Sequence, residues 1–398
     1  MSKNKLKSLS PLKFLTLSSM RKKKFSSAST TPIPKQYPVN KLAGKLHPTR
    51  QCVKITKITE HGDDCKTYTL VADTLRGTES LAYFAAGKYI TVFLNINGMP
   101  ITRAYSLSSS PKQAIKGEYE ITVKCVQDGL ASRYILDNWE LGTEAEISAP
   151  EGSFEYVGLR DARTVICIAG GSGITPFLSL GRAIADGDED FNMILLYGSR
   201  NSDSILFKNE FDELEKRNSK IKVVHVLSHE EKSGYEHGFV TKELIEKYAP
   251  KGTYSVFLCG PQQMYDFVDK ELEKIGLERK FIRHELYGEI HNAKAQSDYP
   301  GGAPETVTIT VSIMDEVKTA TGSANDTILQ ILEKNGIAVP SRCRSGECGW
   351  CHSLLKSGKV YAPKALEERR KADLIFGYIH PCCTFPLSDL DIEVPYSK

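Results

Sequence analysis

The sequence lacks any stretch that is long and apolar enough to cross a bilayer, which would need about 18 apolar residues in a row. The segment "LSPLKFLTLSSM" near its beginning is too short and too polar for that role, and no secretory signal peptide is recognisable there. The chain also lacks a strong overall charge, because 52 basic and 49 acidic residues leave a net charge of +3. We therefore expect no transmembrane segment and no nucleic-acid partner.

Acidic residues are missing altogether from residues 1–59, whereas Lys and Arg recur there, with "RKKK" at residues 21–24. A Ser-rich stretch and "TPIPKQYP" predict little packed structure. We expect residues 1–45 to form a basic, disordered arm. A solvated tail is the simplest reading, and contact with an acidic partner or a membrane surface is the alternative. A mitochondrial-type presequence fits loosely, although Lys outnumbers Arg.

Half of the ten cysteines stand alone, at Cys52, Cys65, Cys125, Cys167 and Cys259. Scattered cysteines in a chain without a secretory signal indicate reduced thiols. The expected location is therefore cytoplasmic.

Short segments of alternating polar and apolar residues follow the arm, from "CVKITKI" to "TEAEISAPEGSFEY". Six or so such strands, punctuated by Gly and Pro, indicate a small antiparallel β-barrel. We assign residues 46–157 to this barrel.

The pattern then changes to an apolar strand, a glycine turn and a helix in "RTVICIAGGSGITPFLSLGRAI", after which strands and helices alternate. Such alternation is typical of a doubly wound parallel sheet. We assign residues 160–290 to an α/β nucleotide-binding domain.

Residues 291–304 are polar and contain Gly and Pro, so they are the best candidate linker. Residues 305–398 follow with two strands, an amphipathic helix in "DTILQILEKNG", a cysteine-rich loop and a closing strand in "LDIEVP". This order predicts an α+β module. The expected fold class is thus a multidomain protein with an antiparallel barrel, a parallel α/β sheet and a small α+β domain.

The cysteine-rich loop reads "CRSGECGWC" and contains Cys343, Cys348 and Cys351. Its Cys-x4-Cys-x2-Cys spacing is that of a plant-type [2Fe–2S] site, whereas structural zinc usually takes two short cysteine or histidine pairs. Gly346 and Gly349 would let backbone N–H groups approach the sulfur atoms. A zinc loop or buried reduced cysteines are the alternatives.

A fourth cluster ligand would come from "YIHPCCTFP", which offers Cys382 and Cys383. Because the cluster needs a thiolate from outside the loop, either residue could serve on spacing alone.

The glycine turn "AGGSGITP", residues 169–176, lies at the end of a strand and opens a helix. Helix N-terminal N–H groups and absent β-carbons allow a pyrophosphate to approach. The turn departs from Gly-x-Gly-x-x-Gly, and the next strand ends in "YGSR" without an acidic residue. By itself it could be only a tight strand-to-helix connection.

The segment "RAYS", Arg103 to Ser106, offers a guanidinium, an aromatic ring and a hydroxyl group. Arg suits a phosphate, Tyr can lie along a flat ring system, and Ser can donate to a ring nitrogen. A surface Arg beside a packed Tyr is the alternative.

Together, "RAYS", "GLAS", "GGSGITP", "CGPQQMY" and the ferredoxin-type cysteine loop occur in a fixed order over residues 50–398. In these motifs the chain resembles the ferredoxin-NADP reductase superfamily, specifically NADH oxidoreductases of the oxygenase-reductase and flavodoxin-reductase-like type with a fused [2Fe–2S] domain. The resemblance implies a flavin-binding barrel, an NAD(P)-binding domain and a β-grasp ferredoxin domain.

The resemblance also implies cofactor-binding residues, all read from matching motifs. The flavin would be bound by "RAYS" and by a Gly-x-x-Ser turn, and the nucleotide by the glycine turn, by "YGSR" and by "CGP". FAD is favoured over FMN, which remains possible because Asp128 stands where many members have glycine. The implied residues are Arg103, Ala104, Tyr105, Ser106, Gly129, Ser132, Gly170, Gly171, Gly173, Thr175, Ser199, Arg200, Cys259, Gly260 and Pro261.

Three residues would lie nearest the reacting atoms by the same resemblance: Ser106, Cys259 and Tyr287, the last as an aromatic cover for the flavin. A tyrosine that is simply packed at the end of a strand is the alternative for Tyr287. The family's distant cysteine lies four residues before a proline, and "CCTFP" places Cys382 at that distance from Pro386. The implied cluster ligands are therefore Cys343, Cys348, Cys351 and Cys382.

NADH or NADPH delivers two electrons together, whereas a [2Fe–2S] cluster takes one, and a flavin between them converts the count. The expected activity is an NAD(P)H:acceptor oxidoreductase that passes electrons through FAD and the cluster, singly, to a partner protein such as an oxygenase or another metalloenzyme. Arg342, Arg344 and Trp350 are hypothesised to form the docking surface for that acceptor. The alternatives are a self-contained reductase of quinone, free flavin or ferric ion, and a non-catalytic electron-transfer or regulatory subunit.

Overall fold

The structure is a computed structural model of the chain, and it describes residues 11–28, 37–127, 129–286, 292–296, 298–367 and 369–395. The chain divides into two compact units, residues 1–45 and residues 46–398. No helix within the described residues is both long and apolar enough to span a membrane.

The first unit is the basic arm, and it contains helix α1 (Pro11–Ser26); helix α2 (Pro38–Leu46) begins in it and ends one residue beyond it. The sequence had predicted a disordered arm, so this helical structure is a difference. Lys, Arg, Leu and Met favour helix, which accounts for it physically. No residue of α2 is buried, and Val39, Leu42 and Leu46 are all exposed.

The barrel begins the second unit and consists of one antiparallel sheet in the order β4-β3-β6-β1-β2-β5. A bridge between Leu107 and Ile121 joins the two edges beside β4 and β5. Alternate residues of the strands point inward to a single apolar core. The strands are β1 (Gln51–Glu60), β2 (Cys65–Ala72), β3 (Tyr89–Ile96), β4 (Met99–Ser106), β5 (Glu118–Lys124) and β6 (Glu144–Ile147), with helices α3 (Pro111–Ile115) and α4 (Leu130–Asn138).

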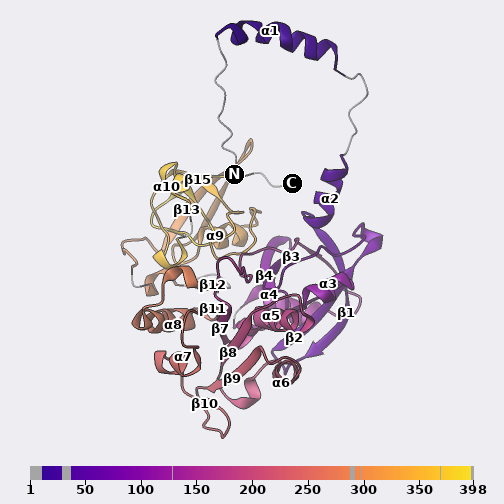
Figure 1. Cartoon of the computed structure of the whole chain (residues 1–398). Coiled ribbons are helices and arrows are strands. Elements are labelled where there is room, and N and C mark those ends of the chain that lie inside the picture. Colours follow the sequence, from indigo (N-terminus) through magenta and orange to yellow (C-terminus); the bar gives the residue numbers. More distant parts are fainter. Residues whose placement is uncertain are drawn as a thin grey trace. The chain divides into compact units, whose positions relative to one another are not determined.

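The nucleotide domain is a six-stranded parallel sheet in the order β10-β9-β8-β7-β11-β12. Helices α5 and α6 cover one face and α7 and α8 cover the other, each over its own apolar cluster (Figure 1). Strand order reverses between β7 and β11, which is where such sheets bind nucleotides. The elements are β7 (Thr164–Gly170), α5 (Thr175–Asp186), β8 (Asn192–Ser199), α6 (Lys208–Arg217), β9 (Ile221–Leu227), β10 (Glu236–His237), α7 (Lys242–Tyr248), β11 (Ser255–Gly260), α8 (Gln262–Ile275) and β12 (Ile282–Leu286).

The C-terminal domain has a five-stranded mixed sheet in the order β14-β13-β19-β15-β17, with a separate β16-β18 pair. Helix α9 packs over this sheet, and its apolar residues join the core of the domain. The elements are β13 (Thr306–Ile313), β14 (Glu316–Ser323), α9 (Ile328–Lys334), β15 (Ser353–Ser357), β16 (Val360–Tyr361), α10 (Lys371–Ile375), β17 (Tyr378–Ile379), β18 (Phe385–Pro386) and β19 (Leu390–Val394).

The expected linker is tied to the C-terminal domain in its described part. The Asp298 carboxylate accepts hydrogen bonds from the Tyr361 hydroxyl (2.5 Å) and from the Lys364 backbone N–H (3.0 Å). Ala293 is fully buried in an apolar cluster with residues around the cysteine loop. The described part of this segment is therefore packed as part of the C-terminal domain.

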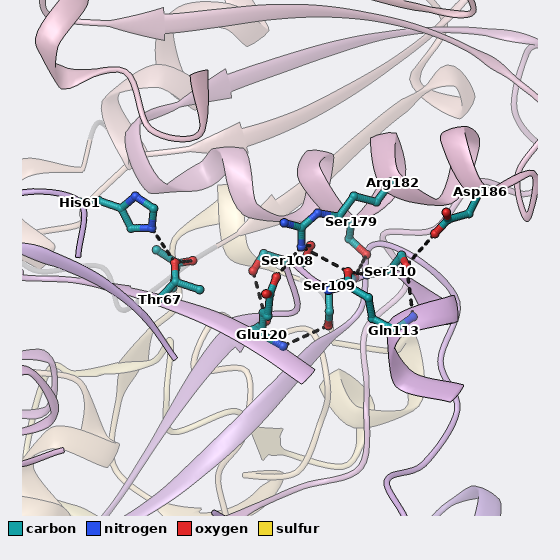
Figure 2. Close-up of polar contacts among 11 residues, drawn as sticks. His61, Thr67, Ser108, Ser109, Ser110, Gln113, Glu120, Ser179, Arg182 and Asp186 are labelled. Atoms are coloured by element: carbon teal, nitrogen blue, oxygen red, sulfur yellow. Dashed lines mark hydrogen bonds and ion pairs between the residues drawn. The ribbon is translucent and has the colours of Figure 1, made fainter. Parts of the chain in front are cut away.

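A polar network joins the barrel to α5 of the nucleotide domain (Figure 2). Arg182 forms an ion pair with Glu120 of β5 and donates to the Ser108 carbonyl at 3.0 Å. One turn further along, at the last residue of α5, the Ser110 hydroxyl donates to Asp186 at 2.9 Å. Charge-assisted bonds of this kind hold the two domains in a defined orientation.

Candidate redox site

The cysteine loop brings together thiols that are far apart in the sequence. The Sγ atoms of Cys351 and Cys382 lie 3.3 Å apart. The Cys343 sulfur accepts the backbone N–H of Cys348 at 3.3 Å, and it is within hydrogen-bonding reach of the thiols of Cys348 and Cys382. The four residues that the family resemblance implied as ligands thus converge on one point.

Cys383 is oriented differently from its neighbour. Its sulfur lies 3.6 Å from the His380 carbonyl and 4.0 Å from the Leu366 carbonyl. A β-carbon on Gly346 would come within 2.7 Å of that sulfur. Cys383 therefore fills space behind the loop.

The backbone of the loop is shaped to surround sulfur. Arg344, Gly346 and Gly349 have φ values of 61°, 86° and 70°, a region that glycine adopts readily. The N–H of Ser345 points to the Cys343 sulfur at 3.5 Å. N–H donors to thiolate sulfur suit an iron–sulfur cluster.

The docking surface hypothesised at Arg342, Arg344 and Trp350 is wrong for the two arginines, because both side chains are buried, whereas Trp350 is 42% exposed. Arg344 makes a bidentate pair with Glu333 of α9 (2.6 and 2.8 Å). Arg342 pairs with Glu151 of the barrel and lies over the Trp350 ring at 3.5 Å. These arginines hold the loop inside the protein and do not face a partner.

The loop is attached directly to the barrel. The hydroxyl groups of Ser341 and Thr102 lie 2.6 Å apart, and the Ser153 hydroxyl donates to Glu347 at 2.6 Å. Helix α9 also contacts β4, the strand that carries "RAYS". A pocket of about 360 Å³ remains at this junction, lined by Tyr89, Glu151, Gly152, Glu347, Cys348 and Trp350.

The expected flavin residues lie along β4 and at the start of α4. Ser106 is buried and pairs with Tyr89 across the ladder. Arg103 and Ala104 are half-buried, and the Tyr105 ring packs partly against the barrel core. Arg103 donates to the Thr102 carbonyl at 2.7 Å, and burial lowers its pKa.

Gly129 is the N-cap of α4 and provides no side chain to cap it. The Ser132 hydroxyl accepts the Val126 N–H at 3.1 Å, which closes the turn. The first N–H groups of α4 therefore suit a phosphate. Asp128, which bore on the choice between FAD and FMN, lies outside the described residues.

The glycine turn lies against the end of β11. A β-carbon on Gly173 would come within 2.3 Å of the Cys259 carbonyl oxygen, and one on Gly260 within 2.6 Å of the Met264 sulfur. Gly171, in contrast, has open space where a β-carbon would point. The close approach of β7 and β11 is what requires glycine here, and the open side suits a pyrophosphate.

The remaining nucleotide residues surround this turn. Cys259 is buried opposite Ala169, and Pro261, at the start of α8, is exposed next to Gly170. Thr175 is buried and its hydroxyl donates to the Ser172 carbonyl at 3.1 Å, so it closes the turn.

Ser199 is the last residue of β8, and Arg200, which follows it, is exposed. The sequence showed no acidic residue at this position, but Glu230 supplies one from the loop after β9. Its carboxylate accepts the Ser202 N–H at 2.7 Å and the Ser202 hydroxyl at 3.2 Å. Only the pairing of β8 with β9 brings Glu230 here, so no local motif could have revealed it.

Glu285, the next-to-last residue of β12, lies opposite Cys259 in the ladder and is buried. Burial raises the pKa of its carboxyl well above the ordinary value, and Glu347 and Cys343 raise it further. Its Oε2 has no hydrogen-bond partner among the described residues. Tyr287, the expected aromatic cover, lies outside the described residues.

Comparison with known proteins supports each domain separately. Family models match the oxidoreductase FAD-binding domain over residues 52–156, the oxidoreductase NAD-binding domain over residues 167–270, and the 2Fe-2S iron-sulfur cluster binding domain over residues 312–387.

Relatives share the whole arrangement. The chain is 28% identical to the glycine betaine monooxygenase reductase subunit of Pseudomonas aeruginosa, over 86% of this chain and 95% of that one. It is 29% identical to the ferredoxin reductase component of 3-ketosteroid-9-alpha-monooxygenase from Rhodococcus rhodochrous, over 85% and 95%. The solved structure of phthalate dioxygenase reductase has a TM-score of 0.62 and 25% identity, over 87% of this chain and 98% of that chain.

The three domains, in this order, define an NAD(P)H oxidoreductase that uses FAD and a [2Fe–2S] cluster. In these domains and in their order, the chain is similar to ferredoxin reductase components of oxygenases. The fold class, the cofactors and the activity predicted from the sequence are confirmed.

Proposed function

We propose that this protein is the reductase component of an oxygenase system and passes electrons singly from its cluster to a separate metalloenzyme. One observation carries the proposal: the cysteine loop is bound to the flavin-binding strand itself, through Ser341 and Thr102 at 2.6 Å. Because of this attachment, we expect the flavin of the same chain to be the group that reduces the cluster. The names of the relatives, which are reductase components of monooxygenases, favour an oxygenase as acceptor.

The residues divide by role in this proposal. Cys343, Cys348, Cys351 and Cys382 hold the cluster. Residues of β4 and the N-terminus of α4 bind the flavin, with Arg103 and Gly129 toward its phosphates and Tyr105 and Ser106 toward its ring. The flavin supplies the conversion of a two-electron donor into single electrons. The turn from Gly170 to Thr175 and the segment from Cys259 to Pro261 position the nucleotide.

The structure around β8 leads us to propose NADH as the nucleotide. Ser199 and Arg200 would lie beside the adenosine ribose. Glu230, which is bound to Ser202 in the same turn and paired with Lys232 at 3.8 Å, provides a carboxylate there. A carboxylate suits a ribose 2′-hydroxyl and repels the 2′-phosphate of NADPH.

The test is an anaerobic titration of the purified protein with NADH and with NADPH, followed by visible absorption. Bleaching of flavin and cluster bands together, with NADH preferred, is the expected result. Bleaching of the flavin without the cluster would contradict the internal electron path. Rapid turnover with quinone, free flavin or ferric ion, and none with any protein acceptor, would favour the self-contained reductase instead.

We also propose a role for the basic arm and a cytoplasmic location. Helix α2 exposes Val39, Leu42 and Leu46 at spacings of three and four residues, with Lys41 and Lys45 between them, which suits an acidic surface on a partner or a membrane. Co-sedimentation of the full chain with anionic but not with neutral vesicles would support binding of the arm to a membrane surface. A chain that does not co-sediment with either kind of vesicle would support binding to an acidic partner protein instead. The five cysteines that are scattered singly along the chain also fit a reducing compartment.

A further inference from the structure

Helix α10 and the residue after it expose a compact apolar surface. Leu374, Ile375 and Phe376 are 48%, 76% and 69% exposed. Within the described residues they form the only run of three consecutive large hydrophobic side chains that are exposed. Apolar patches of this kind on a protein surface usually mark an interaction site.

A single side chain, that of His352, separates helix α10 from the expected cluster ligand Cys351. His352 directly follows Cys351, and its Nε2 lies 3.1 Å from Oδ1 of Asp373 in α10. The His352 ring is also stacked on Tyr378, with centroids 4.1 Å apart and planes at 11°. A continuous set of packed groups therefore connects the cysteine loop to α10.

The other side of the loop is already covered, because Ser341, Arg342 and Glu347 contact the barrel. Figure 1 shows α10 at the end of the C-terminal domain that is away from β4. Electrons that enter the cluster from the flavin side would therefore leave it on the side of the domain where α10 lies.

Lys371 supplies the net positive charge beside the apolar run, because Arg370 forms an ion pair with Asp373. Arg370 is 78% exposed at its side chain, and Lys371 is also exposed. The one acidic residue of α10, Asp373, is buried and bound to Arg370 and His352. An acceptor with carboxylates around an apolar patch would complement this surface.

We propose that Leu374, Ile375 and Phe376, with the rim of Arg370 and Lys371, form the electron-exit surface on which an acidic acceptor protein docks. The inference rests on the proposed function, because it needs electrons to leave the cluster singly for a protein. Transient redox complexes bury little area, so a patch of this size is sufficient. It replaces the surface at Arg342 and Arg344, which is buried.

The test measures electron transfer from the NADH-reduced holoenzyme to cytochrome b5, a small acidic haem protein, and to cytochrome c, a basic one. The wild type is expected to reduce cytochrome b5 faster at low ionic strength. The double variant Ile375→Ser/Phe376→Ser is expected to lower the second-order rate about tenfold. Lys371→Glu is expected to lower it at least threefold, and added salt should remove that effect.

Matched controls come from the β13–β14 hairpin of the same domain. Met314→Ser/Val317→Ser removes two equally exposed apolar side chains, and Lys318→Glu reverses one surface charge. Neither control is expected to change the rate. Bleaching of the cluster by NADH and reduction of ferricyanide should be unchanged in every variant.

The outcomes separate the two proposals. If wild-type protein fails to bleach its cluster with NADH, the proposed function fails. If the cluster bleaches but the α10 variants transfer electrons as fast as the controls do, the exit surface is refuted alone. A wild type that reduces cytochrome c faster than cytochrome b5 would also refute it.

Discussion

The Glu333 carboxylate accepts two hydrogen bonds from the Arg344 guanidinium, at 2.6 and 2.8 Å, and both side chains are buried. This pair ties helix α9, which contacts the flavin-binding strand, to the residue next to a cluster cysteine. Burial alone raises the pKa of Glu333, but the bidentate contact favours its charged form, so we expect an ion pair at neutral pH.

Glu333→Gln should therefore destabilise the protein, because it removes the carboxylate that pairs with the buried Arg344 guanidinium. We expect a loss of about 3 kcal/mol in the free energy of unfolding, measured by denaturant titration of the holoprotein. The exposed pair of Glu316 with Lys318 provides the control, and Glu316→Gln should change stability by less than about 0.5 kcal/mol. Equal effects of the two substitutions would show that the buried pair is not what holds α9 to the loop.

The fourth cluster ligand is tested by two neighbouring substitutions of identical chemistry. Cys382→Ser should abolish the cluster absorption and lower the iron content, because its sulfur is the one beside Cys351. Cys383→Ser should keep both, because the Cys383 sulfur faces backbone carbonyls. Iron and acid-labile sulfide per chain are the measurements. The reverse result would exchange the two assignments.

The glycine turn should tolerate alanine unequally. Gly173→Ala would push a β-carbon to within 2.3 Å of the Cys259 carbonyl, so we expect the KM for the nucleotide to rise at least tenfold or the domain to misfold. Gly171→Ala meets nothing within 4 Å but has a φ of 54°. It should cost about 1 kcal/mol of stability and leave the close approach of β7 and β11 intact. Thermal unfolding and steady-state kinetics on both variants check the difference, and a Gly173→Ala protein with normal KM would contradict it.

Nucleotide preference should depend on Glu230. Glu230→Gln keeps an acceptor for Ser202 but removes the charge, so kcat/KM for NADPH should rise about tenfold. The value for NADH should change little. Glu231→Gln, at the exposed neighbouring residue, should leave both values alone. An unchanged NADPH value in Glu230→Gln would place the carboxylate away from the 2′-phosphate.

Glu189, in the loop after α5, should make stability depend on pH. Burial, and then the charges of Glu155 and Asp188, raise its pKa to about 7 from 4.5. A carboxyl with a raised pKa in the folded state contributes stability that is complete below pH 4.5 and is lost as the pH rises through about 7. Since the group is only partly buried, we expect a loss of about 1 kcal/mol.

Glu189→Gln should remove this pH dependence and stabilise the protein by about 1 kcal/mol at pH 8. Unfolding titrations at pH 5 and pH 8 provide the measurement, with Glu231→Gln as the exposed control. A variant that is no more stable than the wild type at pH 8 would show that the Glu189 carboxylate is adequately solvated.

Most of the architecture could be predicted from the sequence because it depends on local patterns. Alternating residues predicted the barrel strands, and the strand-helix alternation from residue 160 predicted the parallel sheet; both are present. The helices of the basic arm were missed, because Pro and Ser near them favour irregular structure while Lys and Leu favour helix. In residues 1–45 the two sets of local preferences are balanced, so the sequence alone did not predict the helices.

The sequence by itself determined which chemistry the chain can perform, because the spacing of Cys343, Cys348 and Cys351 and the glycines from Gly170 to Gly173 act within a single turn. Only the tertiary structure decided which neighbours those groups have. It buried Arg344 against Glu333 and brought Glu230 to the end of β8. Pairings between residues distant in the sequence depend on packing of whole elements, and no local pattern encodes them.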